Sequence, residues 1–339
     1  LVAVVLVALI VGGSALMRGC TPQTNPNLVS NGTPVTVTVA NGAGGLEIAD
    51  TLYEAGLITG TKPFTDALEK AGAAASPKPG TYTITGGTSI DDIIALLAAG
   101  PKPLATVTVP EGYTLSAVAT AVDQASAGTI SRDAFLAAAE NVSAYAADYS
   151  FLQGVTSLEG FLFPKTYDLA SDATADSLIR AMLDQYQAEI ATLDYSFPTS
   201  RGLSQYQALI LASIVEKESD SNTRGQVAAV FYNRLSNFDD PNYGFLQSDA
   251  TTAYEVGHDP TAEEVHADTP YSTYTHEGLP PTPICQPGLA SLQAVCSPDS
   301  ELLDNGYYYF YFALKDDGTL EYSFSQTLDE HNAAIAADM

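Results

Sequence analysis

Two glutamates, Glu216 and Glu218, follow the apolar run "ALILASIV" at positions 208–215 and are separated only by Lys217. In a helix, successive residues turn by about 100 degrees, so these two side chains point about 160 degrees apart. They therefore cannot share one small site. The nearest neighbours of Glu218 on such a helix are strongly apolar, whereas Glu216 stands on a less apolar face. We expect Glu218 to lie on the buried stripe.

A carboxyl group in that position loses hydration and meets the negative end of the helix dipole. Both effects disfavour its charged form and raise its pKa. A glutamic acid that keeps its proton near neutral pH is the group that general-acid cleavage of a glycosidic bond needs. The alternative is that Glu216 and Glu218 form the solvated end of an amphipathic helix with no chemical role.

The helix that must position the pair has a clear start signal. Ser204 is followed three residues later by Gln207, which is the capping-box pattern, and no helix breaker occurs before Ser219. We therefore expect one helix over residues 204–219, with both glutamates near its C-terminal end.

Several separated motifs accompany this helix in a fixed order. They are "LEGFLFPKTY" (158–167), "LILASIVEKES" (209–219), "VFYNRL" (230–235), "LQSDATTAY" (246–254), "YSTY" (271–274), "GLPPTPICQPGLASL" (278–292) and "LDEHN" (328–332). On these residues the sequence resembles the YceG-like family of endolytic murein transglycosylases over most of the chain. The combination is far more specific than any one motif.

The resemblance implies an N-terminal membrane anchor, a LysM-like module and a lytic transglycosylase domain. Its implied reaction cuts the β-1,4 bond between N-acetylmuramic acid and N-acetylglucosamine inside nascent peptidoglycan strands. One glutamate, here Glu218, is implied as acid and then as base while the muramyl 6-hydroxyl attacks its own C1, so no bound water has to be positioned. Penicillin-binding proteins of wall synthesis are implied partners.

Residues near the "LQSD" motif are candidates for support of Glu218. Gln247 and Asp249 are expected to contact sugar hydroxyls or Glu218 itself, and Glu216 is a further supporting candidate. Two rival functions depend on the same residues. A conventional muramidase needs a second catalytic carboxylate, for which Asp249 is the first candidate, and a non-catalytic scaffold would hold peptidoglycan without cutting it.

Two further pairs are predicted around the site. Asn233 and Arg234 are candidates to orient the neighbouring loop, with a structural Asn and a surface Arg as alternatives. Tyr271 and Tyr274 are candidates to stack on sugar rings, because tyrosine combines an apolar ring with a polar tip, and a core role is the alternative for one of them.

The composition limits the partners. The chain of 339 residues has 40 Asp plus Glu against 13 Lys plus Arg, a net charge of -27 at pH 7. This charge repels nucleic acid, which we exclude as a partner. Because the acidic residues are spread along the chain, they favour a solvated surface over an interaction tail.

The first 17 residues carry no charge, and Arg18 follows them. We predict a transmembrane anchor over 1–18 and expect a charged leader before Leu1, because spanning a bilayer takes about 20 apolar residues. Arg18 disfavours both a cleaved signal peptide and lipidation at Cys20. The expected location is the cell membrane, with a single pass and the bulk of the chain on the extracytoplasmic side facing the wall.

We predict an α+β protein in several parts. A linker composition at 19–34 precedes a small LysM-like module at 35–104, for which the pattern predicts strand, helix, helix, strand and helix. Residues 105–149 repeat the start of that pattern and are interpreted as a connector or second partial module. The catalytic YceG-like domain is expected at 150–339.

The remaining chemistry-bearing residues predict little. Cys285 and Cys296 are close enough in sequence to form a disulfide outside the cytosol, which geometry must decide. His258, Glu263, Glu264 and His266 do not have the spacing of a His-Glu-x-x-His zinc motif. Because of this spacing, we expect no metal. No Gly-rich phosphate loop follows a strand, and we expect no cofactor.

Overall fold

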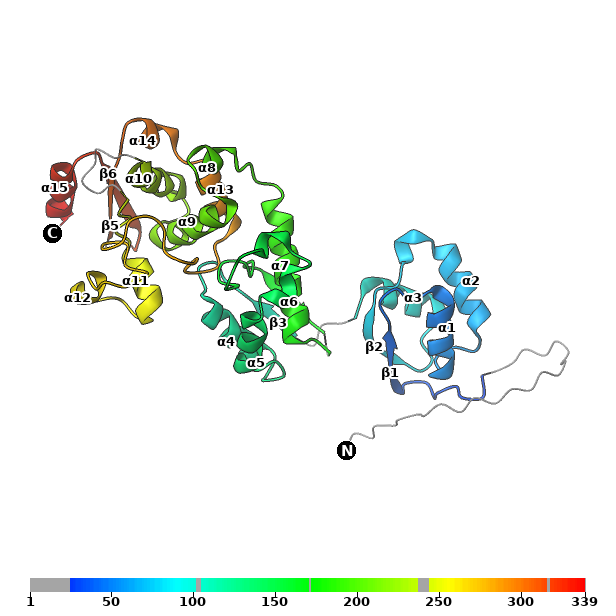
Figure 1. Ribbon diagram of the computed structural model, residues 1–339. Helices are drawn as coiled ribbons and strands as arrows, with labels where there is room; N and C mark the ends of the chain where they lie inside the picture. The colour runs from blue at the N-terminus through cyan, green and yellow to red at the C-terminus, as the bar shows by residue number, and fades with distance from the viewer. Residues whose placement is uncertain (1–24, 102–104, 171, 237–243, 316–317, 339) are drawn as a thin grey trace. The chain divides into compact units, whose positions relative to one another are not determined.

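The computed structural model describes residues 25–101, 105–170, 172–236, 244–315 and 318–338, and the chain divides into two compact units at Lys102 and Pro103 (Figure 1). The predicted anchor at 1–18 and the first part of the predicted linker lie outside the described residues. Among the described residues, none of the helices has the length and apolar character needed to cross a membrane. Helices and antiparallel strand pairs are mixed throughout, as expected for the α+β class.

The smaller unit has the predicted element order. It runs β1 (Pro34–Val39), α1 (Gly45–Glu54), α2 (Thr61–Ala71), a short 3-10 turn (Ala73–Ala75), β2 (Gly80–Thr85) and α3 (Ile90–Ala99). The two strands pair antiparallel, from Pro34 opposite Thr85 to Val39 opposite Gly80. Their inward side chains and the helices enclose a core of its own, which includes Ile48, Leu52, Phe64, Tyr82, Ile93 and Leu97.

Part of the predicted linker is folded onto this unit. Asn25 is buried and donates through Nδ2 to the carbonyl oxygens of Tyr53 and Ile58, at 2.6 and 3.0 Å. Gly56, at φ +72°, would bring an added Cβ to 2.1 Å from the carbonyl oxygen of Asn27. The segment after residue 24 therefore packs closely against the end of α1, which composition alone did not indicate.

The segment 105–149 is an integral part of the larger unit rather than a connector. β3 (Ala105–Thr108) pairs antiparallel with β4 (Thr166–Leu169), which comes from the predicted catalytic domain. Between the two strands lie α4 (Leu115–Ala125), α5 (Arg132–Glu140), α6 (Ser143–Ala146) and a 3-10 turn (Ser150–Leu152). Their buried side chains belong to the same core cluster as the helices that follow. A strand needs a hydrogen-bonding partner, and the local pattern could not show that this partner lies some sixty residues on.

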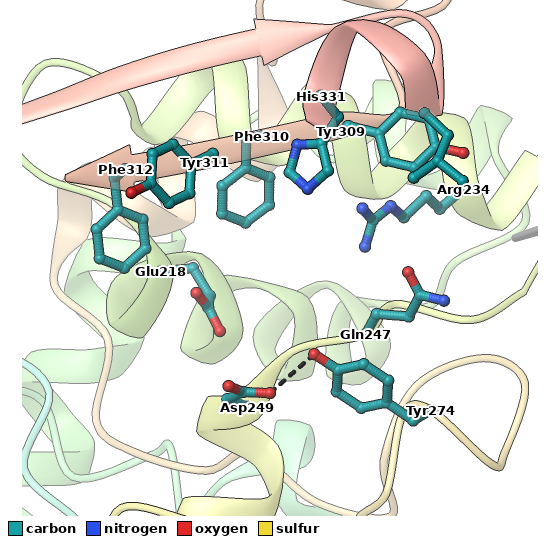
Figure 2. A pocket seen from close by; sticks show the side chains of 11 residues that line it. Glu218, Arg234, Gln247, Asp249, Tyr274, Tyr309, Phe310, Tyr311, Phe312 and His331 are labelled. Atoms are coloured by element: carbon teal, nitrogen blue, oxygen red, sulfur yellow. Dashed lines mark hydrogen bonds between the residues drawn. The ribbon is translucent and has the colours of Figure 1, made fainter. Parts of the chain in front are cut away.

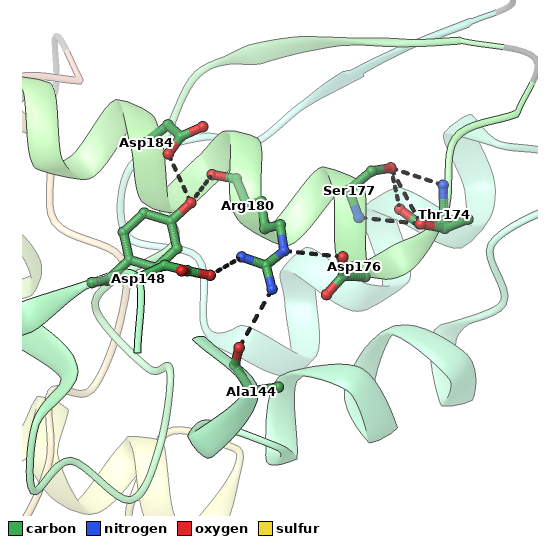
Figure 3. A network of polar contacts seen from close by, with 8 residues as sticks. Ala144, Asp148, Thr174, Asp176, Ser177, Arg180 and Asp184 are labelled. Carbon is green, nitrogen blue, oxygen red and sulfur yellow. Dashed lines mark hydrogen bonds and ion pairs between the residues drawn. The ribbon is translucent and has the colours of Figure 1, made fainter. Parts of the chain in front are cut away.

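Arg180 fastens α7 (Ala175–Ile190) to the preceding segment (Figure 3). Its guanidinium contacts Asp148 at 2.7 Å and Asp176 at 3.1 Å, and donates to the carbonyl oxygen of Ala144 at 3.4 Å. These planar, paired contacts suit arginine better than lysine. They hold α7 to α6 and to the segment that follows it.

The remaining elements are α8 (Ser196–Ser200), α9 (Gln205–Glu218), α10 (Arg224–Ser236), α11 (Asp249–Val256), α12 (Ala262–Val265), α13 (Leu289–Cys296), α14 (Ser300–Asp304), β5 (Tyr309–Leu314), β6 (Leu320–Ser325) and α15 (Leu328–Asp338). The predicted capping box at the start of α9 is confirmed, because Ser204 and Gln207 exchange both bonds. The helix packs against α8, α10, α11 and α13. Residues 208–215 are all buried, so burial does not follow the difference in apolar character between the two faces: α9 is a core helix surrounded by its neighbours.

The two cysteines are free thiols in the structure, so the disulfide considered above is not formed. Cys285 is buried and donates through Sγ to the carbonyl oxygen of Ser213, at 3.3 Å. Its thiol thus faces α9, whereas Cys296 lies at the far end of α13.

A buried carboxyl, Glu159, joins three distant segments of the larger unit. It is 2% exposed and accepts hydrogen bonds from the backbone N–H of Leu115 at 2.9 Å, from Gln286 Nε2 at 2.6 Å and from the Tyr254 hydroxyl at 3.1 Å. Burial raises the pKa of Glu159 to about 7, although these hydrogen bonds oppose the shift. The group is therefore part charged near neutral pH.

We expect Glu159→Gln to reduce the pH dependence of the free energy of unfolding. The pKa of Glu159 in the folded protein lies above its value near 4.5 in the unfolded chain. The stabilisation that Glu159 contributes in wild type is therefore fully present below pH 4.5 and is lost as the pH rises through 7. Glutamine does not titrate and keeps a carbonyl for Leu115. Between pH 4 and pH 8, the free energy of unfolding of the variant should therefore rise by about 3 kcal/mol relative to that of wild type.

Urea unfolding of both proteins at pH 4, 6 and 8 measures this difference. Glu140→Gln, at an exposed glutamate on α5, is the matched control and should leave the pH dependence unchanged. Parallel curves for wild type and Glu159→Gln would contradict the expected titration.

Candidate active site

A pocket of about 630 Å³ opens at the C-terminal end of α9 (Figure 2). Its walls come from α9, α10, the loop before α11, the "YSTY" segment, β5 and α15. The lining residues are Glu218, Arg234, Gln247, Asp249, Tyr274, Tyr309, Phe310, Tyr311, Phe312, Leu328 and His331. Carboxyl and amide groups thus face one aromatic strand, which is a wall suited to a polar ligand with flat apolar faces.

Glu218 is half-buried and held by the segment after "LQ". Ser248 Oγ donates to its Oε1 at 2.5 Å, and the backbone N–H of Ala250 also bonds to the carboxyl. Burial raises the pKa of Glu218, and the charge of Asp249 acts in the same direction, while Ser248, Ala250 and the charge of Arg234 oppose it. The pocket therefore contains a carboxyl group that holds its proton to higher pH than an exposed glutamate.

Gln247 has a backbone conformation that side-chain-bearing residues seldom adopt, with φ at +53°. The neighbouring segment fixes it: the N–H of Gln247 donates to the carbonyl oxygen of Thr273 at 3.1 Å, and the N–H of Ser248 donates to Thr273 Oγ1 at 2.9 Å. The bend places Gln247 on the pocket wall directly before Ser248, which bonds Glu218. Strained backbone of this kind is concentrated at functional sites.

Asp249 and Tyr274 form a second contact within the pocket. Tyr274 donates from its hydroxyl to Asp249 Oδ1 at 2.8 Å, and Figure 2 shows Glu218 pointing toward this pair. The structure thus brings the predicted residues Gln247, Asp249 and Tyr274 together with Glu218. Asp249 is the first residue of α11, where the helix N-terminus favours a negative side chain.

Arg234 is buried at the pocket and is not a surface residue. It is 5% exposed, donates through Nε to the carbonyl oxygen of Tyr308 at 2.7 Å and donates through Nη1 to that of Leu246. It therefore joins the start of β5 to the loop that carries Gln247, as predicted for an orienting residue. Its neighbour Asn233 faces away from the pocket and bonds the carbonyl oxygens of Leu302 and Tyr307, at 3.1 and 2.9 Å. Asn233 has a structural role.

Two other candidates lie outside the pocket lining. Tyr271 contacts Thr282 Oγ1 through its hydroxyl at 2.7 Å and packs its ring on Tyr254, so it supports the "LPPTP" turn. Glu216 is also buried, with its side chain 7% exposed, and accepts hydrogen bonds from the N–H of Gly288 at 3.0 Å and from Ser291 Oγ at 2.7 Å. It fastens α9 to α13. Glu216 and Glu218 do lie in separate environments: the first contacts α13, and the half-buried Glu218 lines the pocket.

Three groups of pocket residues were not predicted from the sequence. Ser248, which contacts Glu218, belongs to the "LQSD" motif, but it has no charged group or aromatic ring that would have indicated a role in the site. The aromatic run 309–312 indicates a strand, yet only its place opposite α9 makes it a pocket wall. His331 belongs to the "LDEHN" motif and stacks on Tyr309 with ring centroids 5.3 Å apart.

Chemically, the arrangement suits acid catalysis on a carbohydrate. A shielded carboxyl can donate its proton to a leaving oxygen, and the hydroxyl of Ser248 and the N–H of Ala250 then stabilise the carboxylate that remains. Within the described residues, no three His, Cys, Asp or Glu side chains are grouped to hold a metal. His258 and Glu264 contact each other at 3.5 Å in an exposed loop.

Comparison with known proteins decides the family. The sequence pattern of the YceG-like family matches residues 37–337, which is most of the chain. The chain belongs to the YceG-like family. The match includes both units, and the motifs that line the pocket all fall inside it.

Relatives of this YceG-like chain are named endolytic murein transglycosylases. One from Streptococcus pneumoniae is 32% identical over 88% of this chain and 58% of its own length, and one from Bacillus subtilis is 29% identical over 89% of this chain and 84% of its own. This chain thus spans little more than half of the pneumococcal relative. A crystal structure of a putative yceG-like protein from Listeria monocytogenes, 28% identical, aligns over 90% of this chain and all of its own with a TM-score of 0.58.

Proposed function

We propose that this protein is an endolytic murein transglycosylase that cuts the β-1,4 bond between N-acetylmuramic acid and N-acetylglucosamine inside peptidoglycan strands. One observation carries the proposal: Glu218 presents a shielded carboxyl of raised pKa at the mouth of a pocket with an aromatic wall. The relatives that share most of this chain bear the same activity in their names.

In the proposed reaction Glu218 begins protonated. It donates its proton to the glycosidic oxygen as the bond to the muramyl C1 breaks, and Ser248 and Ala250 hold the resulting carboxylate. The carboxylate then takes the proton of the muramyl 6-hydroxyl as that oxygen bonds to C1. The products are a free N-acetylglucosamine 4-hydroxyl and a 1,6-anhydromuramyl end, and Glu218 regains its proton. The nucleophile is intramolecular, so one carboxyl group is sufficient.

Asp249 favours a second candidate, a muramidase. It lines the same pocket as Glu218, and Tyr274 fixes its carboxylate by a hydrogen bond of 2.8 Å. A second carboxylate in reach of the cleaved bond is what a hydrolase needs to activate water or to form a covalent intermediate. The two candidates differ in product, because hydrolysis leaves a reducing muramyl end.

Mass spectrometry of purified glycan strands incubated with the full chain in detergent tests both candidates. We expect internal fragments with 1,6-anhydromuramyl ends, and reducing ends would replace the proposal by the muramidase. Asp249→Asn should retain the anhydro products with a rate lowered by less than about a hundredfold, because it removes a neighbour and not the acid. It should also lower the pKa of Glu218, so that activity ends at a lower pH than in wild type.

Asp259→Asn, at an exposed aspartate, serves as the matched control for this charge change. Complete loss of turnover in Asp249→Asn, with Asp259→Asn active, would favour two-carboxylate hydrolysis. Binding of strands without any cleavage by wild type would favour the scaffold instead.

The remaining parts of the chain suggest how the enzyme meets its substrate. We propose that 35–104 is a LysM-like module that holds peptidoglycan, which its strand, helix, helix, strand, helix order supports. The segment 1–18, which is uncharged as far as Arg18, supports a single membrane pass, with the rest of the chain on the extracytoplasmic side facing the wall. Penicillin-binding proteins of wall synthesis are proposed partners at that location.

A further inference from the structure

A second pocket, of about 570 Å³, lies beside the segment that follows Glu218 and shares no lining residue with the first. Its walls come from the loop between α9 and α10, the first turn of α10, the strand β6 and residues on either side of the β5–β6 turn. The lining residues are Asp220, Asn222, Thr223, Gln226, Lys315, Thr319, Leu320, Glu321, Tyr322 and Phe324. The reaction described above uses none of them.

One face of the β5–β6 hairpin connects the two pockets. The register places Phe310 opposite Phe324, Phe312 opposite Tyr322 and Leu314 opposite Leu320, and alternate residues of a strand point to the same side. The rings of Phe312 and Tyr322 are 5.2 Å apart. Phe310 and Phe312 line the first pocket, whereas their partners line the second. A continuous aromatic surface therefore runs from one pocket to the other.

This surface passes directly by the proposed catalytic group. The Tyr322 hydroxyl donates to the carbonyl oxygen of Glu218 at 3.1 Å, so the hairpin is fastened to the end of α9. Toward the hairpin tip the face is open to solvent, with Phe312 39% and Leu320 40% exposed. Exposed aromatic and apolar side chains in a row next to a reactive carboxyl mark a binding surface.

We propose that the second pocket holds an uncharged N-acetylglucosamine ring of the glycan strand, on the far side of the bond that Glu218 cuts. The inference rests on the proposed function and specifies where the strand continues. An enzyme that cuts inside a strand has sugars on both sides of the bond, and Phe312 of the first pocket packs on Tyr322 of the second. The strand crosses this pair and enters the second pocket.

The charges of the second pocket favour the uncharged N-acetylglucosamine over N-acetylmuramic acid, whose lactyl group carries a carboxyl. Asp220 accepts from the N–H groups of Asn222 and Thr223, at 2.9 and 3.0 Å, and so it satisfies the first donors before α10. Lys315 is already paired with Glu321 at 2.9 Å and with Asp338. The walls thus repel phosphate or carboxylate ligands. The side-chain amides of Asn222 and Gln226 offer both donors and acceptors, which hydroxyl and acetamido groups require.

The test compares short and long glycan fragments. In the full chain carrying Glu218→Gln, we measure the affinity for a peptidoglycan disaccharide and an octasaccharide by calorimetry, with and without Gln226→Ala plus Leu320→Ala. These two side chains line the second pocket and are not part of the lining of the first. We expect the octasaccharide to bind about tenfold more weakly and the disaccharide to bind unchanged.

Controls separate this inference from the proposed function. Gln124→Ala, at an exposed glutamine of α4, should alter neither affinity. Equal losses for both fragments, or no loss for the octasaccharide, would overturn the second pocket as a strand site while leaving the reaction intact. A different outcome would contradict the proposed function itself: the Glu218→Gln protein binds neither fragment, and the wild type cuts no strand. The inference would then fail with the proposed function.

Discussion

Glu218→Gln should abolish strand cleavage while leaving strand binding and folding intact. Glutamine has nearly the same shape, and its carbonyl oxygen still accepts the hydrogen bond from Ser248. It has no proton to donate to the glycosidic oxygen and cannot act as a base afterwards. General acid–base groups contribute a factor of about a hundred to ten thousand, and Glu218 acts in both steps, so we expect a rate loss of about a thousandfold or more.

Release of anhydromuramyl ends, followed by mass spectrometry over a range of pH, measures this loss. Wild-type activity should fall as the pH rises through the raised pKa of Glu218, because the acid must be protonated at the start. Glu216→Gln is the matched control, since Glu216 stands two positions away but bonds Gly288 and Ser291 instead of lining the pocket. Residual activity of Glu218→Gln within tenfold of wild type, or inactivity of the control alone, would move the catalytic role elsewhere.

Arg234→Met should destabilise the protein and lower its activity together. The variant fills the space of the side-chain stem but leaves the buried carbonyl oxygens of Tyr308 and Leu246 without their donor. Each unsatisfied acceptor costs about 1–3 kcal/mol, so we expect a loss of about 3 kcal/mol in the free energy of unfolding. The pocket should also loosen, because Arg234 joins the start of β5 to the loop that precedes Gln247.

Urea unfolding and steady-state cleavage measure the two effects. The positive charge of Arg234 lowers the pKa of Glu218, so its removal should let activity persist to higher pH in the folded fraction. Arg201→Met is the control, since Arg201 lies over the ring of Phe197 at 5.2 Å but is exposed. It should cost less than about 1 kcal/mol. An unchanged unfolding midpoint for Arg234→Met would show that another donor satisfies the two carbonyl groups.

Local sequence patterns were sufficient to predict α9, the helix that carries Glu218. The capping box at Ser204 and Gln207 sets the start of α9, and the helical period separates Glu216 from Glu218. The order of elements in 34–99 also follows from neighbouring residues alone. Such features depend on backbone geometry within one or two turns, so the sequence determines them before any tertiary contact forms.

The family motifs extended the prediction to parts of the pocket. Gln247, Asp249 and Tyr274 stand far from Glu218 in the chain, and only the resemblance connected them to it. The same reasoning also named Asn233, Tyr271 and Glu216, which bond other parts of the fold instead. A motif preserves residue types for structural and chemical reasons alike, and residue type cannot separate the two.

Tertiary structure decided the rest. Whether α9 is amphipathic or buried on all sides depends on the helices packed around it, and whether 105–108 belongs to a connector or to the larger unit depends on its pairing with 166–169. Ser248 gains its role only because a left-handed Gln247 bends the loop toward Glu218, and the aromatic strand becomes a wall only because the hairpin is fastened to the end of α9. The sequence by itself determined the helix, its two diverging glutamates and the small unit's element order; the packing of distant segments chose which carboxyl faces a pocket, because burial and hydrogen-bond partners are properties of the assembled fold.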